Sequence, residues 1–258
     1  MRFKFILEPQ ESNNTLPLNY QYPVESWIYN TLQKSDADYA TWLHTTGYSE
    51  NEQKHFKLFC FSQLKFEYKN HSISENKIDF GKHPVEIELS FVTHQATESF
   101  ISGIFLNQEF KLGNLQHAAH FKVQTIQLCP EPEYGQVMKY YAQTPVVISQ
   151  QRSEKHTTYL DPSDAAYAQL FINNLINKYN SVPQSQSLPM QAINFNLLSD
   201  FKKKIITVKE GRSDETKIKG YKFEFELKAP PELHKVLFAT GAGEKNSTGF
   251  GFVIISKR

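Results

Sequence analysis

The alternation of apolar and polar residues along the chain predicts a regular series of strands. A strand with one buried face carries apolar residues at every second position. Segments with this pattern occur at residues 2–7, 56–66, 77–91, 120–128, 136–149, 192–208 and 216–228. A continuous apolar run at residues 252–255 predicts a closing strand, and Ser199-Asp200 predicts a break or bulge inside the segment 192–208.

Apolar residues spaced three and four apart predict helices between these strands. Such stripes occur at residues 23–32, 35–44, 97–110, 161–179 and 230–239. The residues expected to face inward are, in the first three helices, Val24, Trp27, Ile28 and Leu32, then Tyr39, Trp42 and Leu43, then Phe100, Ile104, Phe105 and Phe110. Two local signals support the starts of the first two helices. Pro23 suits a first helical turn, and Ser35-Asp36-Ala37-Asp38 resembles a capping box. The first half is therefore β-α-α-β-β-α-β and the second half is β-α-β-β-α-β.

One supersecondary order thus occurs twice in succession. The sequence predicts an α+β chain of two tandem ferredoxin-like (RRM-like) βαββαβ domains with a C-terminal Gly-rich loop. The segment 129–135, Cys-Pro-Glu-Pro-Glu-Tyr-Gly, predicts the boundary. We expect an N-terminal domain of residues 1–129 and a C-terminal domain of residues 130–258.

Composition favours a packed protein away from membranes. The chain is 40% hydrophobic and 14% aromatic, which is enough for a large core. No apolar stretch approaches the length of a membrane span, and residues 1–7 are too short for a signal segment. Cys60 and Cys129 form no CxxC pair and are typical of buried thiols. We expect a cytoplasmic protein with no membrane partner.

The charge is distributed unevenly. Residues 1–121 hold ten Lys and Arg against fourteen Asp and Glu, a net charge of −4. Residues 122–258 hold eighteen against thirteen, a net charge of +5. A basic second half fits a polyanionic partner. A solvated charged face explains the charge equally well.

Glycine is concentrated in one stretch near the C-terminus, Gly241-Ala-Gly-Glu-Lys-Asn-Ser-Thr-Gly-Phe-Gly251, which we call the Gly-rich loop. It holds four of the chain's eleven glycines. Such density indicates positive φ angles or a close backbone approach. The loop follows a predicted helix and precedes a predicted strand, the reverse of a dinucleotide fingerprint. No Lys-Ser or Lys-Thr follows its last glycine, so it is not a Walker A loop.

The usual catalytic and metal motifs are absent from the sequence. There is no HExxH helix, no GxSxG elbow and no kinase signature. His117 and His120 form a close pair without an obvious third ligand, which favours a surface pair over a metal site. The sequence therefore predicts neither a metal nor a cofactor.

Three residues of the first half could cleave RNA without a metal. His44 can transfer protons near neutral pH, Lys57 can stabilise charge on a phosphorane, and Tyr29 can orient a hydroxyl. Each also has a purely structural interpretation. His44 could simply end a helix, Tyr29 could be a half-buried aromatic residue, and Lys57 could be a solvated strand end.

Two groups of motifs resemble a known family. The Gly-rich loop before a closing strand resembles the signature of the repeat-associated mysterious protein (RAMP) superfamily. Three N-terminal segments are similar in order and spacing to those of the sixth family of CRISPR-associated proteins, the endoribonucleases that process CRISPR precursor RNA. They are Tyr22-Pro23 to Ile28-Tyr29-Asn30, Trp42-Leu43-His44 and Phe56-Lys57-Leu58-Phe59-Cys60-Phe61-Ser62. Residues 65–235 match only as a pattern of elements.

The resemblance implies a metal-independent endoribonuclease that cuts CRISPR precursor RNA within the repeat. It implies Tyr29, His44 and Lys57 as the catalytic set and a product with a 2′,3′-cyclic phosphate. Three alternatives remain open: a catalytically inactive protein that binds repeat RNA, a subunit of a CRISPR effector complex, and a two-domain interaction protein without RNA preference. A homodimer and association with an interference complex are further expected partnerships.

RNA binding would use the cleft between the domains and a basic hairpin in the second one. The expected RNA-binding residues are Lys202, Lys203, Lys204, Arg212, Lys217, Lys219, Gly241, Gly243, Lys245, Asn246, Ser247, Gly249 and Gly251. Phosphate contacts of this kind give affinity and salt dependence rather than sequence choice. A solvated hairpin is the alternative interpretation of the lysines.

Overall fold

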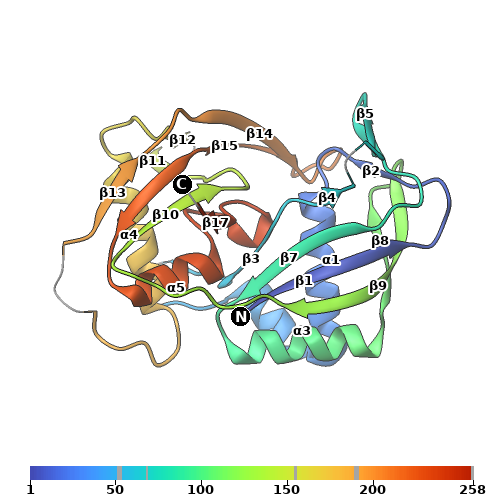
Figure 1. Cartoon of the computed structure of the whole chain (residues 1–258), viewed down its shortest axis with the longest axis horizontal. Coiled ribbons are helices and arrows are strands. Elements are labelled where there is room, and N and C mark those ends of the chain that lie inside the picture. The colour runs from blue at the N-terminus through green and yellow to red at the C-terminus, as the bar shows by residue number, and fades with distance from the viewer. Residues whose placement is uncertain (51–53, 68, 154–155, 189–191, 257–258) are drawn as a thin grey trace.

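The computed structural model describes residues 1–258 except 51–53, 68, 154–155, 189–191 and 257–258. The two halves of the chain form two units that lie side by side (Figure 1). The N-terminal unit holds the blue to green elements, and the C-terminal unit holds the yellow-green to red ones. Among the described residues, no helix has the length and apolar character needed to cross a bilayer.

The N-terminal unit is built on one antiparallel sheet. Its elements are β1 (Arg2–Pro9), β2 (Thr15–Pro17), α1 (Gln21–Ser35), α2 (Ala37–Thr45), β3 (Phe59–Phe61), β4 (Lys65–Phe66), β5 (Ser72–Ser74), β6 (Lys77–Asp79), β7 (Val85–Phe91), α3 (His94–Leu106), β8 (Glu109–Gly113) and β9 (Ala118–Leu128). The main sheet has the order β3-β7-β1-β9-β8, and β4 also pairs with β7. The strands β2, β6 and β5 form a separate small sheet.

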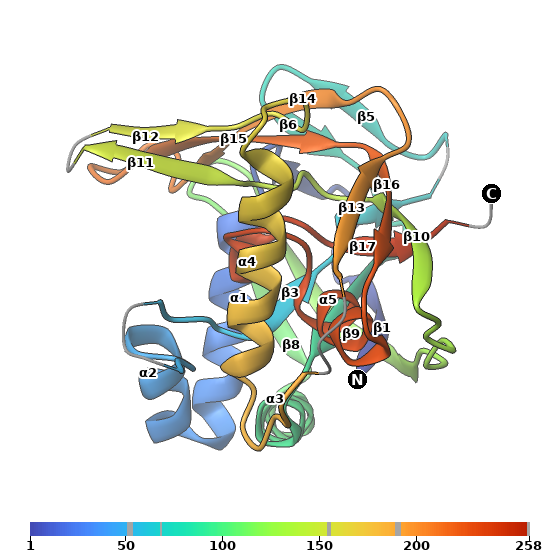
Figure 2. The same ribbon diagram turned by 90° about the vertical axis from the view of Figure 1, so that its left-hand side faces the viewer.

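The C-terminal unit repeats this plan. Its elements are β10 (Val137–Ala142), β11 (Ser149–Ser153), β12 (His156–Tyr159), α4 (Tyr167–Asn180), β13 (Asn194–Leu197), β14 (Lys202–Val208), β15 (Thr216–Lys222), β16 (Glu224–Lys228), α5 (Pro231–Thr240), a 3-10 turn at Asn246–Thr248 and β17 (Val253–Ile255). The sheet order is β13-β16-β10-β17, and the hairpins β11–β12 and β14–β15 project from it (Figure 2). The predicted tandem ferredoxin-like fold is confirmed.

Each unit has its own aromatic core. Phe5 of β1, Trp27 of α1 and Phe100 of α3 meet edge to face, with ring centroids 5.7 to 6.3 Å apart. In the C-terminal unit, Phe225 of β16 lies 5.4 Å from both Tyr140 and Phe171. Burial of each of these rings contributes about 2 kcal/mol of hydrophobic free energy. Two separate cores explain why the same plan can be repeated without a shared sheet.

Several predicted segments of the first half differ in the structure. The segment 56–66 is not one strand, because only β3 and β4 pair with β7. Leu58 has a φ of 54° and breaks the extended backbone just before β3. The segment 77–91 divides into β6 and β7. The third helix ends at Leu106, so Phe110 belongs to β8, and Phe105 is 73% exposed rather than buried.

In the second half, the segment 136–149 is shorter than predicted. Strand β10 ends at Ala142, and the hairpin β11–β12 that follows later was not predicted. The predicted break near Ser199-Asp200 is confirmed, since it separates β13 from β14. A second break at Phe223 separates β15 from β16, which lets the β14–β15 hairpin leave the sheet.

Arg2 joins the two units at their interface. Its guanidinium donates to the carbonyl oxygens of Val253, at 3.0 Å, and Phe238, at 2.5 Å. The same group lies 3.5 and 4.0 Å from the ring centroids of Phe238 and Phe252. Arg2 is only 5% exposed, so these contacts replace most of its hydration. The first strand therefore fixes the C-terminal unit against the N-terminal sheet.

Candidate active site

Helix α1 places Tyr29 at the edge of the N-terminal core. Four apolar side chains predicted to face inward are buried as expected: Val24, Trp27, Ile28 and Leu32. The helix packs closely on α3, because a Cβ on Gly103 would lie only 2.0 Å from the carbonyl oxygen of Thr31. Tyr29 is half-buried beside this stripe. Burial, and secondarily the nearby Glu25 carboxyl, raises the pKa of Tyr29 well above its usual value.

Helix α2 brings His44 to the same place. Asp36 alone separates the two helices, and its carboxylate accepts a 2.9 Å hydrogen bond from the Tyr39 amide. This cap fixes the start of α2, so that His44 in its last turn faces α1. The ring centroids of His44 and Tyr29 lie 4.9 Å apart in an edge-on arrangement. Trp42, expected in the buried stripe, is instead 38% exposed.

Lys57 reaches the backbone of His44 rather than its ring. The Lys57 ammonium donates to the carbonyl oxygens of His44, at 2.8 Å, and Thr46, at 3.4 Å. A cation at these carbonyls also compensates the negative end of α2. Burial lowers the pKa of Lys57, and the Glu25 carboxyl opposes that shift. Gly47 leaves room for the Lys57 side chain to reach these carbonyl oxygens, because a Cβ on Gly47 would lie 3.1 Å from that side chain.

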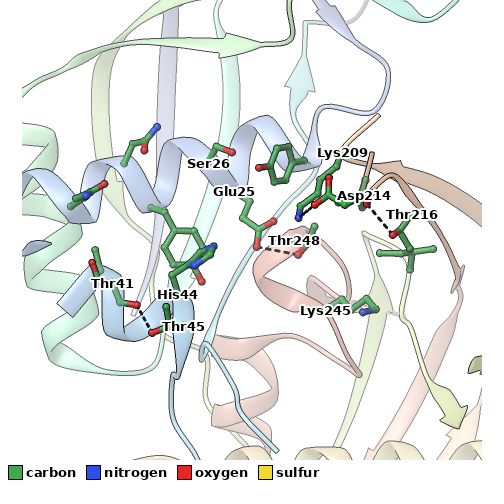
Figure 3. Close-up of a pocket in the computed structure, with 17 residues that line it drawn as sticks. Glu25, Ser26, Thr41, His44, Thr45, Lys209, Asp214, Thr216, Lys245 and Thr248 are labelled. Atoms are coloured by element: carbon green, nitrogen blue, oxygen red, sulfur yellow. Dashed lines mark hydrogen bonds and ion pairs between the residues drawn. The ribbon is translucent and has the colours of Figure 1, made fainter. Parts of the chain in front are cut away.

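Tyr29 and His44 line a pocket of about 670 Å³ between the two units (Figure 3). Helices α1 and α2 form one wall, and the turn of the β14–β15 hairpin and the Gly-rich loop form the other. Side chains of all four elements meet in it: Tyr22, Glu25, Tyr29, His44, Lys209, Asp214, Lys245 and Thr248. Lys57 lines a neighbouring cavity of about 580 Å³, which shares Lys245 and Thr248 with the first.

Glu25 is a pocket residue that sequence reasoning missed. It lies one helical turn before Tyr29, and its carboxylate accepts hydrogen bonds from the hydroxyls of Thr248, at 3.2 Å, and Ser247, at 3.4 Å. Burial raises the pKa of Glu25 to about 7, although both hydroxyls oppose the shift. The only sequence signal was its four-residue spacing from Tyr29. Glu25 thus joins helix α1 to the Gly-rich loop.

The glycines of the Gly-rich loop are buried, and each is required by close packing. A Cβ on Gly241 or Gly251 would lie within 2.8 Å of the Asn246 amide nitrogen. A Cβ on Gly243 would lie 2.4 Å from the carbonyl oxygen of Val147, and one on Gly249 would lie 2.6 Å from the Phe61 ring. The last contact crosses to the N-terminal unit. The loop is therefore part of the interface.

The side chains of the loop differ in exposure. Lys245 is exposed, Asn246 is buried, and Ser247 is half-buried against Glu25. Of the loop residues expected to bind RNA, only Lys245 has an exposed side chain. The buried glycines and Asn246 shape the backbone that carries it.

The predicted basic residues do lie on one hairpin. Lys202, Lys203 and Lys204 are exposed on β14, and Lys217 and Lys219 lie on β15. The turn of this hairpin contacts the start of α1. There Arg212 donates a 2.9 Å hydrogen bond to the Tyr22 hydroxyl, and Asn19 accepts one of 3.2 Å from the Thr207 amide.

Nothing in the described part of the chain gathers three or more His, Cys, Asp or Glu side chains into a possible metal site. His117 lies 3.4 Å from the Thr15 hydroxyl, and His120 is exposed on β9.

This chain shares its tandem fold with solved structures. One is described as an RAMP protein that binds different RNA substrates; the TM-score is 0.82 at 21% identity, and all of both chains is covered. Another comes from a Cas6-related gene of Pyrococcus furiosus, with a TM-score of 0.80 at 20% identity over 100% of this chain and 99% of the other. The fold is thus that of RAMP proteins.

Sequence comparison identifies the family. The model of the CRISPR-associated protein Cas6 N-terminal region matches residues 15–126, and that of its C-terminal region matches residues 129–255. A CRISPR-associated endoribonuclease, Cas6 1 of Methanocaldococcus jannaschii, is 27% identical, with 96% of this chain and 91% of the relative covered. The Cas6 endoribonuclease of Pyrococcus furiosus is 24% identical, with 98% and 89% covered. The chain belongs to the Cas6 family of CRISPR-associated proteins.

Proposed function

We propose that this protein is an endoribonuclease that cleaves CRISPR precursor RNA within the repeat, by attack of a 2′-hydroxyl and without a metal ion. The observation that carries the proposal is the edge-on contact of Tyr29 with His44 in the interdomain pocket. The names of the relatives, CRISPR-associated endoribonucleases, support the substrate class.

The reaction needs two proton transfers and positive charge. The 2′-oxygen bonds to the phosphorus and loses its proton, while the bond from phosphorus to the 5′-oxygen breaks and that oxygen gains a proton. His44 first takes the 2′-proton as a neutral imidazole and then, as the resulting imidazolium, serves as the general acid that gives this proton to the 5′-oxygen, because imidazole exchanges protons near neutral pH. The products are a 2′,3′-cyclic phosphate and a 5′-hydroxyl end.

Tyr29 assists His44 in two ways. Its high pKa keeps the phenol protonated, so the hydroxyl can donate a hydrogen bond to a phosphate oxygen or to a ribose. Its ring also restricts the orientation of the imidazole, since the two rings are in edge-on contact. Both roles require the phenol to stay in the pocket, which the half-buried position favours.

Lys57 and Lys245 supply positive charge from two sides. Lys57 lies at the backbone of His44 and lines the second cavity, and Lys245 lines both cavities. A phosphorane between the two cavities would gain a nearby cation from each unit. The exposed lysines of the β14–β15 hairpin extend this positive surface, and we propose that they bind the RNA backbone.

A cleavage assay with the repeat RNA of the same genome tests the proposal. Labelled RNA is incubated with the protein in excess EDTA, and wild type is compared with His44→Ala. We expect wild type to cut at one position and His44→Ala to bind the RNA without cutting it. Full cleavage by His44→Ala would refute the site assignment.

Two other results would support other functions. Tight, salt-sensitive binding by wild type with no product at any pH would indicate a non-catalytic repeat-binding protein or a subunit of an effector complex. Equal binding of repeat and random RNA would favour an interaction protein without RNA preference.

A further inference from the structure

Lys178 of α4 is buried under the Gly-rich loop. It is 2% exposed, and among the described residues no other lysine is buried. Its ammonium donates to the carbonyl oxygens of Gly241, at 2.7 Å, and Gly243, at 2.6 Å, and to the side-chain oxygen of Asn246, at 2.5 Å. An ammonium has three N–H donors, so all of them are used within one loop.

The loop backbone explains why a cation is needed there. Gly241, Gly243, Lys245, Gly249 and Gly251 all have φ between 58° and 85°. These positive φ angles direct the carbonyl groups of Gly241 and Gly243 toward Lys178, and the hydrogen bonds that they accept are buried. Buried carbonyls require donors, and the Lys178 ammonium supplies them.

Asn246 completes the arrangement from inside the loop. Its amide nitrogen donates to the carbonyl oxygens of Ala242, at 3.0 Å, and Phe250, at 2.9 Å, while its oxygen accepts from Lys178. The two ends of the loop are thus tied together by one side chain, which is itself held by Lys178. Burial lowers the pKa of Lys178 to about 7, and the nearby Cys60 and Glu244 side chains oppose that shift.

The next residues of the loop face the N-terminal unit. Ser247 and Thr248 donate to Glu25, and Gly249 lies against Phe61. The loop is therefore held from the C-terminal side by Lys178 and from the N-terminal side by Glu25. Lys245 lies between these two attachments and is the loop's exposed cation.

We propose that Lys178 is a positioning residue, whose buried ammonium fixes the Gly-rich loop so that Lys245 and Thr248 form the pocket wall opposite Tyr29 and His44. The consequence for cleavage rests on the proposed function. The consequence for the loop does not, because it follows from the hydrogen bonds alone.

The test compares Lys178→Met with Leu175→Ala. Leu175 lies one turn earlier on α4 and is also 2% exposed, but it donates nothing to the loop. Two readouts are used well below the melting temperature of each variant: amide hydrogen exchange of residues 241–251, and the single-turnover cleavage rate at saturating repeat RNA. For Lys178→Met we expect the amides of Ala242, Glu244 and Gly251 to exchange at least tenfold faster and cleavage to fall at least tenfold. For Leu175→Ala we expect less than a threefold change in either.

Two outcomes would overturn the proposal. One is Lys178→Met with wild-type exchange in the loop. The other is Leu175→Ala losing as much loop protection and rate as Lys178→Met at equal stability. If wild type cleaves no repeat RNA, the proposed function is wrong. The hydrogen-exchange measurement then still tests whether Lys178 holds the Gly-rich loop in place.

Asn246→Ala keeps the proposal testable if Lys178→Met does not fold. This variant removes one acceptor of the ammonium and two donors inside the loop but leaves the α4 core intact. We expect faster exchange in residues 241–251 and a several-fold lower cleavage rate. Wild-type values for both would contradict the proposal.

Discussion

The two units share a topology but differ in what they bring to the pocket. The N-terminal unit contributes Tyr29 and His44 from two helices separated by the single residue Asp36. The C-terminal unit contributes a loop and a hairpin, and with them the cations Lys209 and Lys245. Residues 1–121 carry a net charge of −4, whereas residues 122–258 carry +5.

This difference suggests that the N-terminal unit carries out the proton transfers and that the hairpin of the C-terminal unit binds the RNA. Proton transfer needs precise placement, which short, capped and tightly packed helices provide. Attraction of a polyanion needs charge over a wide surface, which an exposed hairpin provides without exact geometry. We therefore expect substitutions in the N-terminal unit to change the rate of cleavage and substitutions in the hairpin to change affinity.

The largest expected effect is that of His44→Ala on the cleavage step. Loss of a general acid should lower the single-turnover rate by about 10² to 10⁴-fold, with the dissociation constant of the RNA within threefold of wild type. His94→Ala is the matched control, because His94 is exposed on α3 and pairs with Glu98 on the same helix. Equal rates for the two variants would remove His44 from the mechanism.

Lys57→Met should lower the same rate by about 10²-fold, because it removes a cation beside the reacting phosphate. It should also lower the free energy of unfolding by about 1 kcal/mol, since the carbonyl oxygens of His44 and Thr46 lose their donor. Lys65→Met, which changes an exposed ion pair with Glu86, is the control. A stability loss with an unchanged rate would show that Lys57 only caps α2.

Glu25→Gln should change the pH dependence of stability. The pKa of Glu25 is raised from 4.5 to about 7. Between these two pH values the folded protein therefore keeps the carboxyl proton that the unfolded chain has already released. Wild type should therefore lose stability as the pH rises from 4.5 to 7, by up to about 1.4 kcal/mol per pH unit, and stay lower above pH 7.

Glu25→Gln should lack this loss, because its amide oxygen still accepts from Thr248 without charge. Chemical denaturation at several pH values measures the difference, with the exposed Glu109→Gln as control. If the free energy of unfolding changed with pH in the same way for wild type and Glu25→Gln, ionisation of the Glu25 carboxyl would not destabilise the folded protein, and the prediction would be wrong.

Removal of lysines from the β14–β15 hairpin should have the smallest effect on the rate of cleavage. The double variant Lys202→Ala with Lys204→Ala should weaken RNA binding. It should also reduce the slope of the logarithm of the binding constant against the logarithm of the salt concentration by about 1.4, at about 0.7 per phosphate contact on a single strand. The rate at saturating RNA should stay within twofold of wild type. The control pair, Lys111→Ala with Lys122→Ala, removes the same charge from the exposed face of the β8–β9 hairpin. Equal slopes for the two pairs would contradict hairpin binding.

The sequence predicted the tandem fold because its signals are local. Period-two strands and helical stripes are repeated in the same order, and most inward-facing residues of α1 and β16 are apolar. The predictions from sequence were wrong where contacts between residues far apart in the sequence determine the conformation. The positive φ of Leu58 and the exposure of Phe105 have no signal in the neighbouring residues.

Glu25 and Lys178 could not be found in this way for a related reason. Charged residues on helices are usually solvated, so helical spacing alone does not predict their burial. Lys178 does fall in the inward stripe of α4, next to Tyr179, but its partners lie more than sixty residues later in the chain. Only the fold brings the Gly-rich loop over that lysine.

The most direct test of the central claim, attack by a 2′-hydroxyl, uses a repeat RNA with one 2′-deoxy nucleotide immediately 5′ of the cut. The end groups of the products are determined in EDTA for this RNA and for the unmodified one. The account predicts a 2′,3′-cyclic phosphate from the unmodified RNA, and equal binding but no cleavage of the deoxy substrate. Cleavage of the deoxy substrate at the same position would contradict it.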